Sequence, residues 1–319
     1  MSNKEKIAFL FPGQGSQKIG MGKDLFENHV VARKVFTEVD EVLKLNLSKV
    51  IFEGSELELK QTRNTQPALM AVSIAIVKVL EYETKKNFSE LAEVICGHSL
   101  GEYTALCSVG CISLSDTAKL LRLRGESMEK TIINTKTKMS AILGLHFDKV
   151  QMIINEDDNA GICEIANDNS PGQIVLSGHS KKVEIISEKC LTHGAKRSID
   201  LNVSAPFHCS LMKNVGEIMN AAFQDVCFNN FNSKFINNYN AKFVNDTHEI
   251  KHLLVEQISS KVRWRESITN ITETGVQNFI EVGSGKVLTG LNKRMNLDIK
   301  GSNIETMSDV SLFLEKYCR

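Results

Sequence analysis

Short apolar runs that end at a glycine recur along the chain, and they predict strands followed by tight turns. Residues 7–11 (IAFLF) form one such run, closed by Pro12-Gly13, which predicts a buried strand and a turn. Residues 94–96 (VIC) lead into a second glycine-containing turn, and the stretch 102–109 lacks helix breakers, so a helix is expected after it. Residues 279–282 (FIEV) predict a late strand of the same sheet. Strands that alternate with helices place this part of the chain in the α/β class.

A longer stretch is apolar on almost every side between Ala68 and Leu80, and it predicts a helix buried inside a domain. Pro67 stands directly before this stretch and suits the first turn of a helix, where a missing N–H costs nothing. We therefore expect the helix to begin near Gln66.

Between about 138 and 202 the predicted strands and helices are shorter and follow one another more closely. The pattern predicts strands and helices in the order βαββαβ, which is typical of a ferredoxin-like unit. The turn between the two middle strands is marked by Asn169-Ser-Pro-Gly172. The expected elements are a strand at 140–145, a helix at 148–155, strands at 162–167 and 173–176, a helix at 180–193 and a strand at 195–201.

Composition narrows the class of protein. The 319 residues include 38 Lys and Arg and 38 Asp and Glu, so the formal net charge is zero. The basic surplus that favours binding to nucleic acid or to an anionic membrane is missing. The longest stretch without a charged side chain, from 64 to 77, is too short to span a membrane. The apolar run at 7–11 is too short for a signal peptide, so we expect a cytoplasmic protein with no nucleic-acid or membrane partner.

The eight cysteines are scattered, with no Cys-x-x-Cys pair and no Cys/His cluster of zinc-site spacing. Reduced and mostly buried thiols are the expected state. The sequence therefore predicts no metal site and no cofactor.

Residues 97–101 (GHSLG) match G-x-S-x-G, the turn that lifts a serine hydroxyl off the end of a strand. A serine needs a base within hydrogen-bond reach, and the chain has eight histidines. His208 follows a predicted strand and a loop with a proline, and it lies downstream of Ser99, so it is the candidate base. His98 is expected to point away from the serine.

An acyl transfer also needs N–H donors aimed at the oxyanion. The backbone N–H of Leu100, directly after the serine, is the expected first donor, and the turn at Gln14 could bring a second. Nucleotide binding is disfavoured for the same turn, because Lys18 stands where G-x-G-x-x-G requires a glycine.

Arg122 and Arg124 lie two residues apart in a predicted helix and must therefore point in different directions. One can face solvent while the other faces the interior, where a guanidinium group demands an anion. That anion is either an internal Asp or Glu or the carboxylate of a substrate.

Taken together, these segments resemble the malonyl-CoA:acyl-carrier-protein transacylase family, which is related to the acyltransferase domains of polyketide synthases. The similarity spans nearly the whole chain, and several ordered motifs are more specific than one turn. The motifs are 11–17 (FPGQGSQ), 65–69 (TQPAL), 97–103 (GHSLGEY), 124–125 (RG), 167–173 (NDNSPGQ), 203–208 (VSAPFH), 257 with 262–264 (VRW), and 281–290 (EVGSGKVLTG).

The resemblance implies a role for each matching residue. Ser99 would attack the malonyl thioester and His208 would take its proton, while the backbone amides of Gln14 and Leu100 would form the oxyanion hole. Arg124 would bind the free malonyl carboxylate. Phe207 would be the aromatic residue that selects malonyl. Gln257 would be the residue whose main-chain carbonyl orients the histidine of a Ser-His dyad.

The same resemblance implies a hydrolase-like α/β catalytic domain over 1–137 and 203–319, with a mostly parallel sheet, and an inserted ferredoxin-like subdomain over 138–202. The expected activity moves malonyl from malonyl-CoA, a coenzyme A thioester, to the phosphopantetheine thiol of acyl carrier protein in fatty acid biosynthesis. No cofactor takes part, and a monomer is expected.

Two alternatives stay open from the sequence. A stand-alone acyltransferase of a polyketide synthase would carry the same motifs, and a thioesterase or esterase on this scaffold would have no obvious use for Arg124. For docking of an acidic carrier, basic residues near the motifs are candidates: Lys18, Lys23, Lys286 and Arg294.

Overall fold

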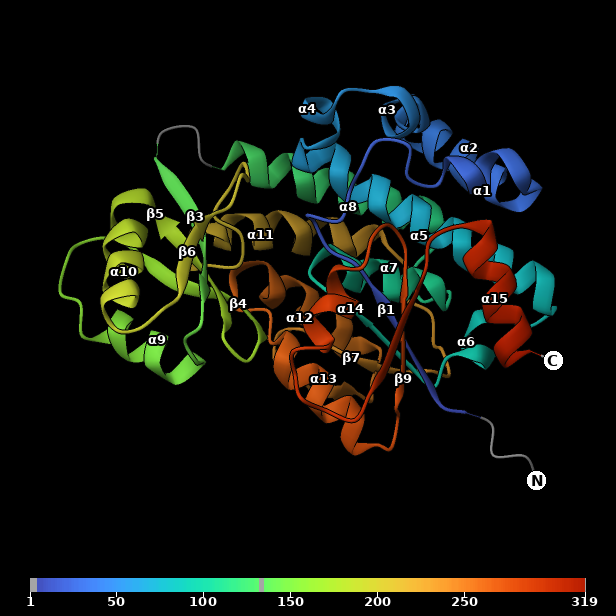
Figure 1. Cartoon of the computed structure of the whole chain (residues 1–319). Helices are drawn as coiled ribbons and strands as arrows, with labels where there is room; N and C mark the ends of the chain where they lie inside the picture. The colour runs from blue at the N-terminus through green and yellow to red at the C-terminus, as the bar shows by residue number, and fades with distance from the viewer. Residues whose placement is uncertain (1–4, 132–134, 319) are drawn as a thin grey trace.

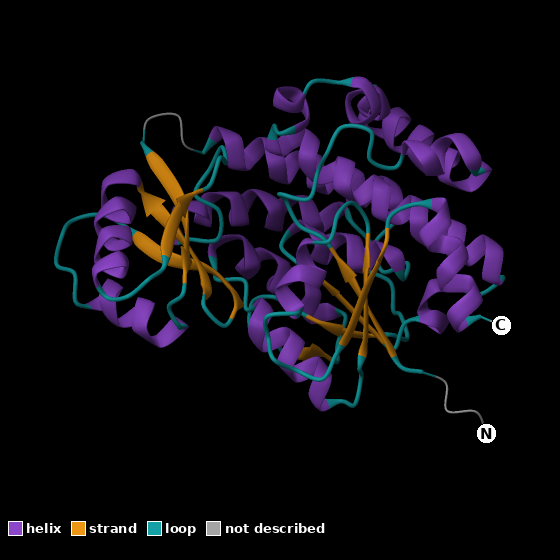
Figure 2. Ribbon diagram, viewed as in Figure 1, coloured by secondary structure: helices purple, strands orange, loops and turns teal. Residues whose placement is uncertain are grey.

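The computed structural model describes residues 5–131 and 135–318, and these form an α/β fold with two sheets (Figure 2). The larger sheet has six strands in the order β10-β9-β1-β2-β7-β8, and all neighbours are parallel except β7 and β8. Its strands are β1 (Ile7–Phe11), β2 (Val94–Gly97), β7 (Lys234–Ile236), β8 (Phe243–Val244), β9 (Asn278–Val282) and β10 (Lys300–Ile304).

The alternation of side chains on β1 explains how this sheet is covered on both faces. Ile7, Phe9 and Phe11 join the large core beneath the long helices, whereas Ala8 and Leu10 join a second cluster around Trp264. A parallel strand that is apolar on both sides must be covered on both sides, as it is here. The helices outside the 138–202 region are α1 (Lys23–Asn28), α2 (Val30–Leu43), α3 (Leu47–Glu53), α4 (Glu56–Leu59), α5 (Thr62–Thr84), α6 (Phe88–Leu91), α7 (Leu100–Ser108), α8 (Leu114–Lys130), α11 (Lys213–Ala222), α12 (His248–Ser259), α13 (Trp264–Glu273), α14 (Val287–Asn292) and α15 (Met307–Tyr317), with 3₁₀ turns at Ser210–Met212 and Phe223–Asp225.

The smaller sheet is entirely antiparallel and has the strand order β4-β5-β3-β6. Helices α9 and α10 cover its outer face, and the opposite face turns towards the main body (Figure 1). The predicted succession of strands and helices in this region is present, although the first middle strand continues into the predicted turn and leaves only Pro171-Gly172 between strands. The elements are β3 (Thr137–Leu143), α9 (Phe147–Asn155), β4 (Cys163–Ser170), β5 (Gln173–His179), α10 (Ser180–Thr192) and β6 (Arg197–Asp200).

The buried helix predicted after Pro67 is α5, but it begins earlier than expected, at Thr62, so Pro67 lies inside it. A proline there cannot donate the helical hydrogen bond to the carbonyl oxygen of Arg63. Arg122 Nη1 on α8 donates to that oxygen instead, at 3.4 Å. The neighbouring helix thus compensates for the missing donor. Among the described residues, no helix is long and apolar enough to cross a membrane.

The small sheet is joined to the main body through consecutive residues of β4. Val262, just before α13, donates to the Ala166 carbonyl and accepts from the Asp168 N–H, at 2.8 and 3.0 Å. The Asp168 carboxylate is buried and receives bonds from Nε and Nη2 of Arg265, the shortest at 2.7 Å. An isolated β-bridge to Val262 and an ion pair to Arg265 therefore fix β4 against α13 and the residues before it.

We expect Arg265→Ala to lower the free energy of unfolding by about 3 kcal/mol, because it leaves the buried Asp168 carboxylate unpaired. Adding Asp168→Asn in the same chain should recover part of that loss. Urea unfolding followed by circular dichroism measures both. Arg263→Ala is the matched control, since its ion pair with Glu266 is partly exposed and should be worth about 1 kcal/mol or less. Equal losses for the two arginines would contradict the assignment.

Candidate active site

The loops that follow the carboxyl ends of β1, β2 and β7 meet at one edge of the large sheet, and Ser99 lies at the centre of that edge. Ser99 follows β2 directly and precedes α7, with φ 55° and ψ −112°. Such a backbone is strained for a residue with a side chain. The flanking glycines are required by close approach, since a Cβ at Gly97 would lie 1.9 Å from the Gly101 carbonyl oxygen.

His208 is brought to Ser99 from more than a hundred residues away. Its Nε2 lies 2.7 Å from Ser99 Oγ, and its Nδ1 lies 2.9 Å from the main-chain carbonyl oxygen of Gln257. A carbonyl oxygen only accepts, so the proton of a neutral ring sits on Nδ1, and Nε2 is left to accept from the serine hydroxyl. This is the geometry that proton transfer from a nucleophilic serine requires.

The surroundings of His208 keep its ring neutral. Burial, followed by the positive charge of Arg124, lowers the pKa of His208 to about 3. The imidazole is therefore unprotonated throughout the neutral pH range, which leaves the Nε2 lone pair free to accept the hydrogen bond from Ser99.

Arg124 is the arginine of the pair that faces the interior, and it is 1% exposed. Its Nη1 donates to Gln66 Oε1 at 2.9 Å, and its Nη2 approaches Gln257 Oε1 at 2.9 Å and Ser99 Oγ at 3.3 Å. Arg122 instead turns towards Glu126 and Asn64, near the surface.

The charge of Arg124 is unusual because its hydrogen-bond partners are all neutral. No Asp or Glu of the described residues lies within 4 Å of the guanidinium, and its Nε has no acceptor there. Burial accordingly lowers the pKa of the Arg124 guanidinium. Of the two anions open from the sequence, the internal carboxylate is thus absent at ion-pair distance within the described part of the chain.

Gln257 contacts the site with its side chain as well as with its carbonyl. Besides accepting from Arg124, its amide donates through Nε2 to the Ser99 carbonyl oxygen, at 2.8 Å, and to Glu102. The family resemblance had pointed to the main-chain carbonyl alone. The side-chain contacts carry no local sequence signal, because they join residues that are far apart in the chain.

The two expected oxyanion donors lie at the ends of adjacent strands. Gln14 belongs to the turn after β1, and Leu100 is the first residue of α7. Within residues 5–131 and 135–318, neither backbone N–H has a hydrogen-bond acceptor. Two unpaired amides beside a candidate nucleophile can stabilise an oxyanion.

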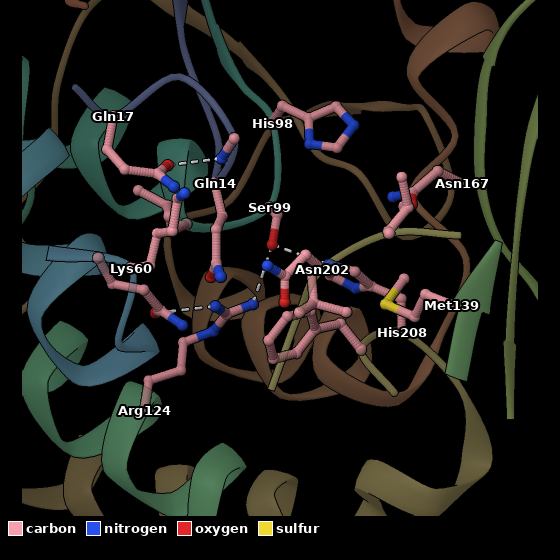
Figure 3. Close-up of a pocket in the computed structure, with 16 residues that line it drawn as sticks. Gln14, Gln17, Lys60, His98, Ser99, Arg124, Met139, Asn167, Asn202 and His208 are labelled. Atoms are coloured by element: carbon pink, nitrogen blue, oxygen red, sulfur yellow. Dashed lines mark hydrogen bonds between the residues drawn. The ribbon is translucent and has the colours of Figure 1, made fainter. Parts of the chain in front are cut away.

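These groups line a pocket of about 260 Å³ (Figure 3). Arg124 reaches up from α8 towards Ser99, and Phe207 and Met139 belong to the apolar part of the lining. His98 also lines the pocket, which the sequence had not indicated, although its ring bonds to Asn169 Oδ1 at 2.9 Å rather than to the serine. In the described chain, no group of three or more His, Cys, Asp or Glu side chains could hold a metal ion.

The sequence of this chain is similar to those of known proteins. Residues 8–301 match the acyl transferase domain family. The chain belongs to this family. It is 41% identical over 97% of its length to "Malonyl CoA-acyl carrier protein transacylase" of Bacillus subtilis, of which it covers 96%.

Solved structures of the family superpose over almost the full chain. The acyl-carrier-protein-S-malonyltransferase of Bartonella henselae has a TM-score of 0.95 and 45% identity, with 98% of this chain and 100% of that chain covered. A malonyl-transacylase solved in complex with a type II PKS acyl-carrier protein has a TM-score of 0.93 and 35% identity, with 98% and 99% covered. The structural similarity to these proteins therefore covers almost the whole chain, including the elements around Ser99.

The buried, neutral state of His208 predicts a pH dependence of stability in this acyl transferase. A ring with a pKa of about 3 when folded, and of about 6.5 when unfolded, binds an extra proton only in the unfolded chain. The free energy of unfolding should then fall by about 1.4 kcal/mol per pH unit between pH 6 and pH 4 through this residue. His208 has a φ of 58°. Asparagine lacks the titrating group and tolerates such a positive φ.

We therefore expect the stability advantage of the parent over His208→Asn to shrink by about 1.4 kcal/mol from pH 6 to pH 5. Urea unfolding at several pH values measures this difference. A difference that stays constant with pH would mean that His208 binds protons equally in both states.

Proposed function

We propose that this chain transfers malonyl groups from malonyl-CoA to the phosphopantetheine thiol of acyl carrier protein through a malonyl ester of Ser99. The observation that carries the proposal is the buried guanidinium of Arg124, which lies 3.3 Å from Ser99 Oγ and has no Asp or Glu of the described residues at ion-pair distance. A substrate with a free carboxylate near its thioester would supply the missing anion.

The first half-reaction follows from the distances at Ser99. Oγ attacks the thioester carbonyl while its proton passes to His208 Nε2, 2.7 Å away. The oxyanion that forms is stabilised by the N–H groups of Gln14 and Leu100. The carbon–sulfur bond then breaks, the CoA sulfur takes the proton from His208, and the malonyl ester remains.

The second half-reaction repeats these steps in reverse. The carrier thiol gives its proton to His208 and attacks the ester, and Ser99 recovers its proton as the new thioester forms. The main-chain carbonyl of Gln257 holds the ring in place through both halves, so the pair works as a Ser-His dyad without an acidic residue. No cofactor is needed for this sequence of steps.

Selectivity for malonyl follows from the same pocket. An acetyl group would leave the Arg124 charge buried without its anion, which is costly. Phe207 is 8% exposed and lies in the pocket lining beside His208, where an aromatic ring limits room for a branch on the acyl group.

The finer description of the fold belongs to the same proposal. The strand order β4-β5-β3-β6 with βαββαβ connection supports a ferredoxin-like subdomain over 138–202. The parallel neighbours of β1 and the serine turn after β2 support a hydrolase-like catalytic domain over 1–137 and 203–319. Of these ranges, residues 1–4, 132–134 and 319 lie outside the described chain. The cytoplasmic location and the monomeric state stay predictions.

Carrier docking by the four basic candidates also stays a prediction. Three of them already have partners. Lys18 pairs with Glu305 at 2.7 Å, Lys23 lies 3.7 Å from Glu53, and Arg294 donates to the side chain of Gln173. An acidic carrier would have to compete with these partners.

Intact mass spectrometry after mixing with malonyl-CoA tests the covalent step. We expect a malonyl adduct on the parent, none on Ser99→Ala, and loss of the adduct when holo acyl carrier protein is added, with the malonyl group appearing on the carrier. An adduct that decays to free malonate in the presence of a competent carrier would favour the hydrolase alternative. Transfer only to a polyketide synthase carrier would favour that pathway.

Arg124→Ala tests the role of the guanidinium. We expect acylation by malonyl-CoA to fall roughly 10²–10³-fold, because a charge-assisted contact is lost, while acylation by acetyl-CoA stays the same or rises. Stopped-flow or quenched mass measurements with both thioesters give the ratio. Arg122→Ala, two residues along the same helix and outside the pocket, is the control and should leave the ratio unchanged. Equal losses for both substrates would assign Arg124 a structural role.

A further inference from the structure

Beneath Ser99 lies Asn238, a buried residue just after β7 that does not line the pocket. Its side-chain amide spans the strained turn. Oδ1 accepts from the Ser99 N–H, and Nδ2 donates to the Gly97 carbonyl oxygen, each at 2.7 Å. The orientation of the amide is fixed, because an N–H only donates and a carbonyl oxygen only accepts.

These two hydrogen bonds satisfy backbone groups that the sharp turn removes from regular structure. Gly97 ends β2 and Ser99 precedes the first residue of α7, so the Ser99 N–H lies between the two elements, and its acceptor is Asn238 Oδ1. A buried backbone group without a partner costs about 1–3 kcal/mol. Loss of both bonds would favour relaxation of Ser99 towards an unstrained backbone, and its Oγ would move.

Asn238 is itself held by a buried carboxylate. Its backbone N–H donates to Glu102 Oε1 at 2.9 Å, and its carbonyl accepts from the Arg263 N–H at 3.0 Å. The other oxygen of Glu102 accepts from the side-chain amide of Gln257, which also donates to the Ser99 carbonyl. The backbone of the turn is therefore tied at Gly97 O, Ser99 N and Ser99 O.

Glu102 is 1% exposed, and no Lys, Arg or His of the described chain lies within 4 Å of its carboxylate. Burial raises the pKa of Glu102 to about 8, while the bonds from Asn238 and Gln257 and the charge of Arg124 act in the opposite direction. Both oxygens of this buried carboxyl group accept hydrogen bonds from residues that bond to the Ser99 turn, so Glu102 fixes the positions of those residues.

We propose that Asn238, fixed by Glu102, is a positioning residue that holds the Ser99 turn in its strained conformation. This keeps Ser99 Oγ within reach of His208 Nε2 and keeps the Leu100 N–H aimed at the same reacting carbonyl. The inference rests on the proposed function for its substrate, but it concerns the reactivity of Ser99 with any acyl or phosphoryl electrophile.

The proposal predicts which kinetic constant changes. Asn238 and Glu102 lie outside the pocket lining, so substrate affinity should be preserved. A displacement of the nucleophile by about 1 Å can slow a reaction about 100-fold. The rate at saturating substrate should therefore fall, and KM should stay nearly constant.

The main variant is Asn238→Asp, which keeps the size and the acceptor for the Ser99 N–H but places an oxygen against the Gly97 carbonyl. The matched control is Asn237→Asp. Asn237 is the preceding residue, is also buried, and donates through Nδ2 to the Lys242 carbonyl at 2.8 Å, without any contact to the turn. Both variants lose the same kind of donor in the same loop.

Two readouts keep this inference separate from the proposed function. The first is malonyl-enzyme formation over a range of malonyl-CoA concentrations. The second is the rate at which diisopropyl fluorophosphate labels Ser99, followed by intact mass, in which an Oγ–P bond forms as fluoride leaves and His208 takes the proton. If the parent is labelled but takes no malonyl group, the proposed function fails while the comparison of variants still decides the inference.

We expect Asn238→Asp to lower both the labelling rate and kcat by about tenfold or more, with KM within about threefold of the parent, and Asn237→Asp to leave them within about twofold. Parent-like labelling by a folded Asn238→Asp would overturn the proposal, as would equal losses in the two variants. A parent that is not labelled at all would overturn it too, since Ser99 would not be activated.

Glu102→Gln provides a second variant if Asn238→Asp does not fold. Its Oε1 can still accept from Asn238, but an amide N–H2 would then face the amide N–H2 of Gln257. We expect labelling to slow several-fold, with unchanged KM. Labelling at the parent rate would remove Glu102 from the proposed role.

Discussion

The backbone of Ser99 is held at a positive φ between two glycines, and much of the buried polar structure around it makes that conformation possible. Asn238 bonds to both sides of the turn, and Gln257 bonds to the Ser99 carbonyl. Without such partners, the turn would bury unsatisfied backbone groups in addition to its torsional strain. The backbone of this turn is therefore held by the loop after β7 and by α12 as well as by its own glycines.

The electrostatics of the pocket follow from one buried cation among neutral acceptors. Arg124 donates to the side-chain oxygens of Gln66 and Gln257, and both of these acceptors are uncharged. The same charge helps to lower the pKa of His208, so the group that needs an anion also keeps the base unprotonated. A bound carboxylate would offset the charge of Arg124 and thereby favour the transient protonation of His208 during transfer. In the proposed transfer, a single guanidinium would therefore link the binding of the substrate to the protonation of His208.

The sequence predicted those parts of the site whose signal is local. The glycines around Ser99, the continuous apolar run of β1 and the divergence of Arg122 from Arg124 all depend on neighbours within a few residues. His208 was found by its loop and its chain order, and Leu100 and the turn at Gln14 by the need for oxyanion donors. The roles of Phe207 and Gln257 came from the resemblance. The fold class and the two-sheet arrangement could be anticipated for the same reasons.

Other features depend on contacts between distant segments and left no local signal. Asn238 lies 139 residues from Ser99, and its neighbour Asn237 has the same chemistry without the same contact. The start of α5 at Thr62 could not be read from its apolar stretch, because residues 62–66 are polar and the Arg63 carbonyl that Pro67 cannot bond to is met by Arg122 on α8. The sequence shows which residue types are present. Contacts with other elements determine which asparagine bonds to the Ser99 turn and at which turn α5 begins.

Three consecutive residues of β4 show how the smaller sheet takes part in the site. Asn167 lines the pocket, Asp168 pairs with Arg265 on α13, and Asn169 bonds to His98 beside the serine. Residues that follow one another in a regular strand alternate between its faces, and only two of the three could share one direction. Irregular register between Ile165 and Asn167, and again between Asp168 and Ser170, changes that alternation. The strand thereby contacts α13 through Asp168, lines the pocket through Asn167, and bonds to the pocket-lining His98 through Asn169. The ion pair of Asp168 and Arg265 therefore fixes against α13 the strand whose neighbouring residues contact the pocket or its wall.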